Sequence, residues 1–387
     1  MIIDFYAGKF GLTGKPDVQS HRQIIMKNTI LLFFAGLILS MQSYAQPQRE
    51  SDVNSPDKAK LDSMTAAINS QQYPNIHSVL ISYRGNTVFE RYFKGEDEEW
   101  GQKKGLIAHG PTDLHDLRSC SKSVVSACTG IAISKGMIKS INQRVMEFFP
   151  EYKSLDTGLR SKLTLEHLLT MSSGILWNEE VPYDNPLNSE IRMTSSPDPT
   201  KYVLSQPFTS KPGDLWSYNG GTTQLLAAVI KKVSGLEIDV FAVRYLFGPL
   251  GITNYEWKKF PGLDLPAAAS GLRLTSRDML KFGLLYLNDG VYDKKRILEG
   301  QWVNESMKTH ISRGRGEGYG YQFWMMDSKS LGGDYMLPAC VGNGDQRIFI
   351  DQKKQLVVVV TAGNYNKWDI PKGSFELLAD YIYPALR

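Results

Sequence analysis

Cysteine is scarce in this 387-residue chain, which has only Cys120, Cys128 and Cys340. Three cysteines are too few for a framework of disulfide bonds. Cys120 and Cys128 lie in a stretch with helical periodicity, so we expect them as small buried side chains. Neither sign of charge predominates, because the chain has 44 basic and 40 acidic residues, and no block is rich in Lys and Arg. This composition gives no support for a nucleic-acid partner.

Short-spaced histidine motifs are also missing. Neither H-x-H nor H-E-x-x-H spacing, which is typical of metal sites on one strand or helix, occurs among the histidines. The six are His21, His77, His109, His115, His167 and His310. The sequence therefore predicts no metal site, and no motif indicates an organic cofactor.

The N-terminal segment contains an apolar run, Ile30 to Leu39, which is too short for a comfortable membrane span. It follows a charged start at Met26-Lys27 and precedes the small-residue stretch Ser43-Tyr44-Ala45, an order typical of a secretory signal peptide. We interpret residues 1–45 as an upstream extension plus a signal peptide, and 46–58 as a polar leader. A periplasmic or secreted protein without a stable membrane span is then expected, and an uncleaved anchor is the alternative.

Residues 59–387 have the composition of a globular domain. Four β-rich runs lie near its two ends: 77–83, 87–93, 346–350 and 355–361. Helical patterns fill most of the middle, and an acidic run, Glu96 to Glu99, is expected as a solvated loop. The segment 176–212 is rich in Pro, Asn, Asp and Ser, which is typical of an irregular excursion that forms a lid or a site wall.

This order of elements predicts an α+β fold. One antiparallel sheet would be built from both termini and flanked by helices, with an inserted, mainly helical lobe at about 125–335.

A serine and a lysine three residues apart, Ser119 and Lys122, open an apolar helical run. The two lie on one face of the first turn, where free N–H groups favour an alkoxide and burial weakens the hold of a lysine on its proton. Ser119 is thus a candidate nucleophile and Lys122 a candidate base. An ordinary N-cap serine with a solvated lysine is the alternative. Cys120 is a weaker candidate nucleophile, because no histidine is adjacent to it.

A second candidate element is the turn that carries Trp216 and Tyr218 ahead of another apolar helix. A tyrosine at a helix entrance can present its phenol to a cleft, where a neighbouring lysine would lower its pKa and let it pass a proton. Trp216 would form part of the cleft wall. The alternative is a half-buried aromatic with a satisfied hydroxyl.

These segments together resemble the serine β-lactamase-related hydrolases, in the class C β-lactamase and D-alanyl-D-alanine carboxypeptidase branch. The resemblance covers about residues 60–385 and rests on four stretches: Ser119-x-x-Lys122, Leu165 to Gly174, Pro212 to Ile230, and Ser270 to Met279.

The resemblance implies a β-lactamase/transpeptidase-like fold and an acyl-enzyme on Ser119. Lys122 and Tyr218 would share the role of general base and return the proton to the leaving group. The family has a third motif on a strand, which corresponds here to Val341 to Gln346. Backbone N–H groups of Ser119 and of this strand would bind the oxyanion.

Two departures from the family pattern concern substrate binding. Gly220 replaces the Asn or Ser of the tyrosine turn, so Asn219 becomes the candidate for the contact to the substrate amide. In the third motif, Gly342 or Asn343 stands where the family has Lys or His, and Arg347 is the nearest possible replacement. The candidate substrate-binding residues are Trp216, Asn219, Asn343, Gly344 and Asp345.

The missing cation normally holds a substrate carboxylate. The sequence therefore favours an exported serine hydrolase that cleaves a small ester or amide, without a cofactor. The alternatives are a β-lactamase or D-Ala-D-Ala carboxypeptidase proper, and a non-catalytic envelope protein that binds peptidoglycan fragments.

Overall fold

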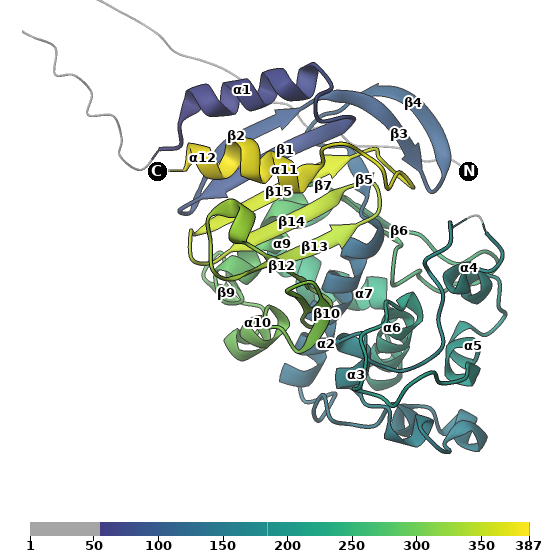
Figure 1. Ribbon diagram of the computed structural model, residues 1–387. Coiled ribbons are helices and arrows are strands. Elements are labelled where there is room, and N and C mark those ends of the chain that lie inside the picture. Colours follow the sequence, from purple (N-terminus) through teal and green to yellow (C-terminus); the bar gives the residue numbers. More distant parts are fainter. Residues whose placement is uncertain (1–54, 184, 387) are drawn as a thin grey trace, which may run out of the picture. The chain divides into compact units, whose positions relative to one another are not determined.

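The computed structural model describes residues 55–183 and 185–386, and within them eight strands form one antiparallel sheet (Figure 1). The strand order is β10-β11-β12-β13-β14-β15-β1-β2. The N-terminal strands are β1 (Ile76–Tyr83) and β2 (Asn86–Tyr92). The others are β10 (Ile311–Gly314), β11 (Glu317–Tyr319), β12 (Trp324–Asp327), β13 (Met336–Gly342), β14 (Gln346–Asp351) and β15 (Leu356–Ala362). Because β1 pairs with β15, the predicted sheet built from both ends of the domain is confirmed.

Helices cover both faces of this sheet, and β15 shows why. Its alternate residues Val358 and Val360 join the core under α1 (Lys58–Asn69), whereas Val357 and Val359 join the core under α9 (Ser276–Leu287). A strand buried on both faces is a continuous apolar run, as this one is. The C-terminal helical segment shares the α1 face and comprises α11 (Ser374–Leu377), the π-helical turn η7 (Leu378–Ile382) and α12 (Tyr383–Ala385).

The helical lobe begins with the 3-10 turn η1 (Arg118–Cys120) and α2 (Ser121–Ser134), and α2 packs against α6 (Gly220–Ser234). Its other helices are α3 (Leu165–Leu169), α4 (Ser189–Thr194), α5 (Pro199–Ser205), α7 (Ile238–Ala242) and α8 (Gly248–Leu250). Its further turns are η2 (Val145–Phe148), η3 (Pro150–Leu155), η4 (Arg160–Lys162) and η5 (Val243–Phe247). The expected limit at about 335 was wrong, because β10 to β12 belong to the main sheet and α9 packs on it.

Three small sheets complete the described part of the chain. β3 (Lys94–Glu99) and β4 (Gln102–Ala108) form a hairpin, and β5 (Leu114–Asp116), β7 (Leu272–Thr275) and β6 (Tyr255–Trp257) pair in that order. β8 (Val291–Tyr292) and β9 (Lys295–Arg296) form a short ribbon, and α10 (Gly300–Ser306) and η6 (Lys329–Leu331) follow. The acidic run Glu96 to Glu99 is therefore part of a strand, and the expectation of a solvated loop was wrong.

Three sequence-based expectations concern the membrane, the leader and the cysteines. Within the described residues, no helix has the length and apolar character needed to cross a membrane. The predicted signal peptide and most of the predicted polar leader lie outside the described residues. Cys120, Cys128 and Cys340 are free and buried, which confirms that they pack as small side chains.

Candidate active site

Ser119 lies on the 3-10 turn η1, directly ahead of α2. Lys122, one turn further along, is only 1% exposed. Its Nζ donates to Ser119 Oγ at 3.0 Å and to the carbonyl of Ala269 at 2.9 Å. The two hydrogen bonds hold the lysine nitrogen against the serine hydroxyl. The structure thus brings together the two side chains that the S-x-x-K spacing indicated.

Arg118, just before the serine, has a left-handed backbone with φ of 48°. This conformation costs a non-glycine residue roughly 1–2 kcal/mol and persists only where its surroundings fix it. The Arg118 guanidinium contacts Glu98 at 2.7 Å and Asp116 at 3.3 Å, and it lies 5.2 Å from the ring centre of Trp100. The β3–β4 hairpin, through Glu98, therefore helps to hold the turn that presents Ser119.

Asp116 is the buried centre of this support, and replacing it by alanine should destabilise the protein by about 3–5 kcal/mol. Its carboxylate is 0% exposed, forms an ion pair with Arg273 Nε at 2.8 Å and accepts from the N–H of Trp100 at 2.7 Å, so its loss leaves the guanidinium and the N–H without this partner. Urea unfolding of Asp116→Ala checks this. Glu256→Ala is the control, because that carboxylate is 56% exposed and its loss should cost under about 1 kcal/mol. Equal losses in the two variants would contradict the prediction.

Tyr218 lies against the Ser119–Lys122 pair, with Lys122 Nζ 5.0 Å from its ring centre. Burial raises the pKa of Tyr218 well above its usual value, and the charge of Glu179 adds to this effect, while a hydrogen bond with Ser119 opposes it. The expectation that lysine would lower this pKa was wrong in direction, because burial and nearby carboxylates dominate. The phenol is therefore protonated at neutral pH.

The predicted site wall at 176–212 contributes a carboxylate that the sequence analysis did not single out. Glu179 Oε1 accepts from the N–H of Gly220 and from Trp177 Nε1, both at 2.5 Å. Its Oε2 accepts from Tyr183 at 3.0 Å. Glu179, Trp177 and Tyr183 all line the cavity that contains Ser119, so the interpretation of this segment as a wall is confirmed.

A second acidic group, Glu190 on α4, is buried beside Glu179. Its Oε1 accepts from the Ser270 hydroxyl at 2.6 Å. Burial raises the pKa of Glu190 to about 7, and the negative charge of Glu179 contributes, whereas Lys122 acts in the opposite direction. The sequence analysis did not single out this carboxyl pair, because the contact between Glu179 and Glu190 depends on how the segment between them folds.

Glu190→Gln should remove a pH dependence of stability. In the unfolded chain Glu titrates near 4.3, so between about pH 4.3 and 7 the folded protein binds more protons and its stability falls as pH rises. The free energy of unfolding of the glutamine variant minus that of wild type should therefore be larger at about pH 8 than at about pH 5. Urea unfolding at both values measures this difference. Glu180→Gln is the control, because that cavity residue is exposed; identical pH slopes in wild type and Glu190→Gln would contradict the prediction.

The cavity around Ser119 has a volume of about 520 Å³ and largely aromatic walls. Trp216 lies 6.0 Å from Trp324 between ring centres, and the Arg313 guanidinium lies 3.7 Å from the centre of Trp324. Trp216 was a predicted wall residue, and the structure places it there. The lining also includes Glu180, Ser217, Tyr218, Val341, Gly342, Asn343, Gly344, Asp345, Arg347, Lys367, Trp368 and Ile370.

The third-motif residues lie in the turn between β13 and β14. At Gly342 a Cβ atom would come within 2.2 Å of the carbonyl oxygen of Leu117, so glycine lets the end of β13 approach the chain just ahead of Ser119. Asn343, Gly344 and Asp345 line the cavity as predicted.

Two of these side chains already have partners. Asn343 Nδ2 donates to Asn366 Oδ1 at 2.7 Å, and the Asp345 carboxylate accepts from the N–H of Ser374 at 2.7 Å and its hydroxyl at 2.6 Å. Asp345 therefore has a structural role as well as a place in the wall.

Asn219 is fully buried and does not line the cavity. Its Oδ1 accepts from the N–H of Thr222 at 3.2 Å and so caps α6. The geometry therefore gives no support to Asn219 as the replacement for the missing substrate contact, because helix capping turns its side chain inward.

Arg347 lines the cavity, but its guanidinium is engaged. It donates to the carbonyls of Gly342 and Gln346, both at 2.9 Å, and lies 3.1 Å from the carboxylate of Asp345. Lys367, an exposed residue of the same lining, is a further cation. The third motif thus offers no buried, unengaged cation of its own.

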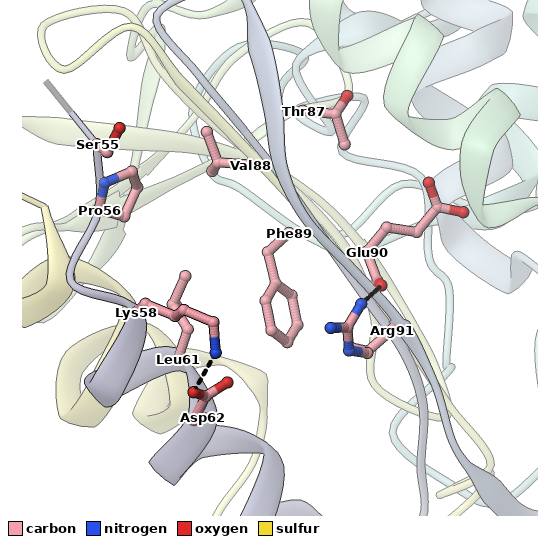
Figure 2. Close-up of a pocket in the computed structure, with 10 residues that line it drawn as sticks. All are labelled: Ser55, Pro56, Lys58, Leu61, Asp62, Thr87, Val88, Phe89, Glu90 and Arg91. Atoms are coloured by element: carbon pink, nitrogen blue, oxygen red, sulfur yellow. Dashed lines mark hydrogen bonds and ion pairs between the residues drawn. The ribbon is translucent and has the colours of Figure 1, made fainter. Parts of the chain in front are cut away.

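A second hollow, of about 690 Å³, lies between the start of α1 and β2 (Figure 2). Its lining includes Ser55 and Lys58, which form a second S-x-x-K match in the sequence. Figure 2 shows Lys58 directed at Asp62, and these two groups pair at 2.5 Å with exposed fractions of 84% and 58%. This match lacks the burial and the serine–lysine contact found at Ser119.

Comparisons with known proteins agree with this geometry. A family model described as Beta-lactamase matches residues 64–372. The chain is 24% identical over 238 residues to 6-aminohexanoate-dimer hydrolase of Paenarthrobacter ureafaciens, a match that covers 59% of this chain and 56% of that protein. The chain spans about half the length, or less, of the curated relatives it matches first.

Solved structures share the fold. A putative 6-aminohexanoate-dimer hydrolase from Bacillus anthracis superposes with a TM-score of 0.63 at 21% identity, covering 80% of this chain and 77% of that one. A family VIII carboxylesterase superposes with a TM-score of 0.65 at 15% identity, covering 85% and 97%. With the family model matching most of the domain, these similarities show that the chain belongs to the Beta-lactamase family.

Proposed function

We propose that this protein is an exported serine hydrolase that cleaves a small ester or amide through an acyl-enzyme on Ser119. The observation that carries the proposal is the 3.0 Å contact between Lys122 Nζ and Ser119 Oγ, in a cavity of about 520 Å³ that Tyr218 also lines. A nucleophile in contact with a basic group, itself held by a third group, is the arrangement that activates a hydroxyl.

In the proposed reaction, Ser119 Oγ bonds to the acyl carbon as its proton passes to Lys122 or through Tyr218. The carbonyl oxygen becomes an oxyanion, which the N–H of Ser119 and one from the turn after β13 would bind, at about 3 kcal/mol per donor. The leaving group departs with a proton from the Tyr218 phenol, which regains one from Lys122. Water then adds to the acyl-enzyme by the same route and releases Ser119.

The cavity favours substrates without a carboxylate next to the scissile bond. Penicillins and D-Ala peptides carry that carboxylate, and the family residue that binds it is replaced here by Gly342 or Asn343. Arg347, the nearest cation, is already paired with Asp345. The similarity to an aminohexanoate-dimer hydrolase and to a carboxylesterase supports both amides and esters as substrate classes.

The test is the intact mass of the folded protein after incubation with a fluorophosphonate and, separately, with a penicillin, followed by peptide mapping. We expect a fluorophosphonate adduct on Ser119 and little or no penicillin adduct. A rapid, stoichiometric penicillin adduct would indicate a β-lactamase or carboxypeptidase proper. No adduct with either reagent would favour a non-catalytic protein that binds peptidoglycan fragments.

The proposed export has a separate test. The signal-peptide pattern predicts cleavage before Gln46, so N-terminal sequencing of protein from the periplasm or medium should begin there. A start far from Gln46 would contradict a cleaved signal peptide.

A further inference from the structure

Four side chains with ligand atoms converge from segments that are separate in the sequence. His77 comes from β1, Asp97 from β3, His109 directly follows β4, and His115 lies on β5. Their donor atoms all lie within 4.8 Å of one another. None of the four lines the cavity around Ser119, so this cluster is distinct from the candidate active site.

Four of the six ring nitrogens of this cluster lack hydrogen-bond partners. Both nitrogens of His109, Nδ1 of His77 and Nδ1 of His115 are buried and make no hydrogen bond. A buried polar atom without a partner typically costs about 1–3 kcal/mol. Each neutral imidazole has one N–H and one lone pair, so the three rings offer three lone pairs in one place, which indicates a ligand that accepts them.

The second ring nitrogen of His77 is held as in many metal-binding histidines. His77 Nε2 lies 3.0 Å from the carbonyl of Glu96, and because a carbonyl only accepts, Nε2 carries the hydrogen. Nδ1 then has a free lone pair, 3.9 Å from Asp97 Oδ1. The Asn75 side chain holds the backbone of Glu96 in place, because it donates to the Glu96 carbonyl at 2.8 Å and accepts from the Glu96 N–H at 2.7 Å. Such an outer hydrogen bond sets the tautomer and orientation of a metal ligand.

The stacking of two of these rings also favours the form that binds metals. His77 and His109 stack with ring centres 3.8 Å apart, an arrangement that two charged rings would disfavour. Neutral imidazoles with one carboxylate are ligands that Zn²⁺ takes readily.

We propose that His77, Asp97, His109 and His115 form a structural site for one Zn²⁺-like divalent transition-metal ion. Ligand atoms around tetrahedral zinc lie about 3.4 Å apart, given bond lengths of about 2.1 Å, so small side-chain rotations would close the cluster. The ion would tie the β3–β4 hairpin to β1 and β5. Histidine spacing gave no sign of this site, because its ligands come from four different segments.

The test titrates Zn²⁺ into untagged, chelator-treated protein and follows heat of binding and the unfolding temperature. We expect one ion per chain and a rise in Tm, since an ion that binds only the folded state stabilises it. His109→Ala and Asp97→Asn should each weaken binding by at least about tenfold. Both variants should fold, because the His109 nitrogens have no partner to lose and asparagine keeps the oxygen that accepts from the Glu98 N–H.

Two controls make the result decisive. His310→Ala removes a histidine outside the cluster and should bind Zn²⁺ like wild type. Ser119→Ala should also bind normally, so the test is independent of the proposed hydrolase. No uptake by wild type, unchanged binding in both ligand variants, or an equal loss in His310→Ala would overturn the proposal; the first outcome would leave water as the occupant.

Discussion

Ser119→Ala is expected to lower kcat/KM for an ester or amide substrate by roughly 10⁴-fold or more while the protein stays folded. Without the hydroxyl that receives the Lys122 hydrogen bond, no acyl-enzyme can form. Lys122→Ala should be about as damaging, because the two groups act as one unit, and the double variant should be little worse than either single one. Steady-state kinetics with the three variants tests this expectation.

The controls for this prediction separate Ser119 from nearby alternatives. Ser55→Ala removes the serine of the other S-x-x-K match and should retain wild-type activity, since its lysine pairs with Asp62. Cys120→Ala should also retain most activity, because burial raises the pKa of that thiol well above its usual value and keeps it protonated. Loss of activity in Cys120→Ala with retention in Ser119→Ala would reverse the assignment of the nucleophile.

Tyr218→Phe is expected to lower kcat by about 10²–10⁴-fold for substrates with poor leaving groups. An alkoxide or amine must be protonated as it leaves, and the raised pKa of Tyr218 keeps a proton available there. A nitrophenolate needs no such proton, so the loss should be much smaller for a nitrophenyl ester. The measurement compares kcat for a nitrophenyl ester and an alkyl ester of the same acid.

Tyr183→Phe is the matched control for this comparison. Tyr183 lines the same cavity, but its hydroxyl donates to Glu179 rather than contacting Ser119. We expect Tyr183→Phe to change kcat for both esters by the same small factor. If Tyr218→Phe also lost activity equally on both esters, the phenol would not be the proton donor to the leaving group.

The spacing of apolar residues in the sequence determined which segments form the central strands and the helix after Ser119. The runs around Val79 and Val360 identified the strands that join the two ends of the domain, because pairing of buried β-rich segments follows from a local pattern. The same local logic placed Ser119 and Lys122 one helical turn apart at the start of an apolar helix. The assignment of the short strands β10 to β12 to the main sheet escaped it, and so did the strand at Glu96 to Glu99, whose charged residues have no apolar pattern.

Tertiary structure alone decided which groups surround those residues. Tyr218 was placed correctly at the site, yet the direction of its pKa shift depends on its burial and then on the charge of Glu179, both of which the fold of the site wall sets. Asn219 was predicted to contact the substrate, but its side chain caps α6 and does not line the cavity. His77 and His115 come from strands of different sheets, so no spacing rule could have paired them. Spacing reports neighbours within one helix or strand, whereas burial, charge and ligand geometry depend on distances that only the folded chain sets.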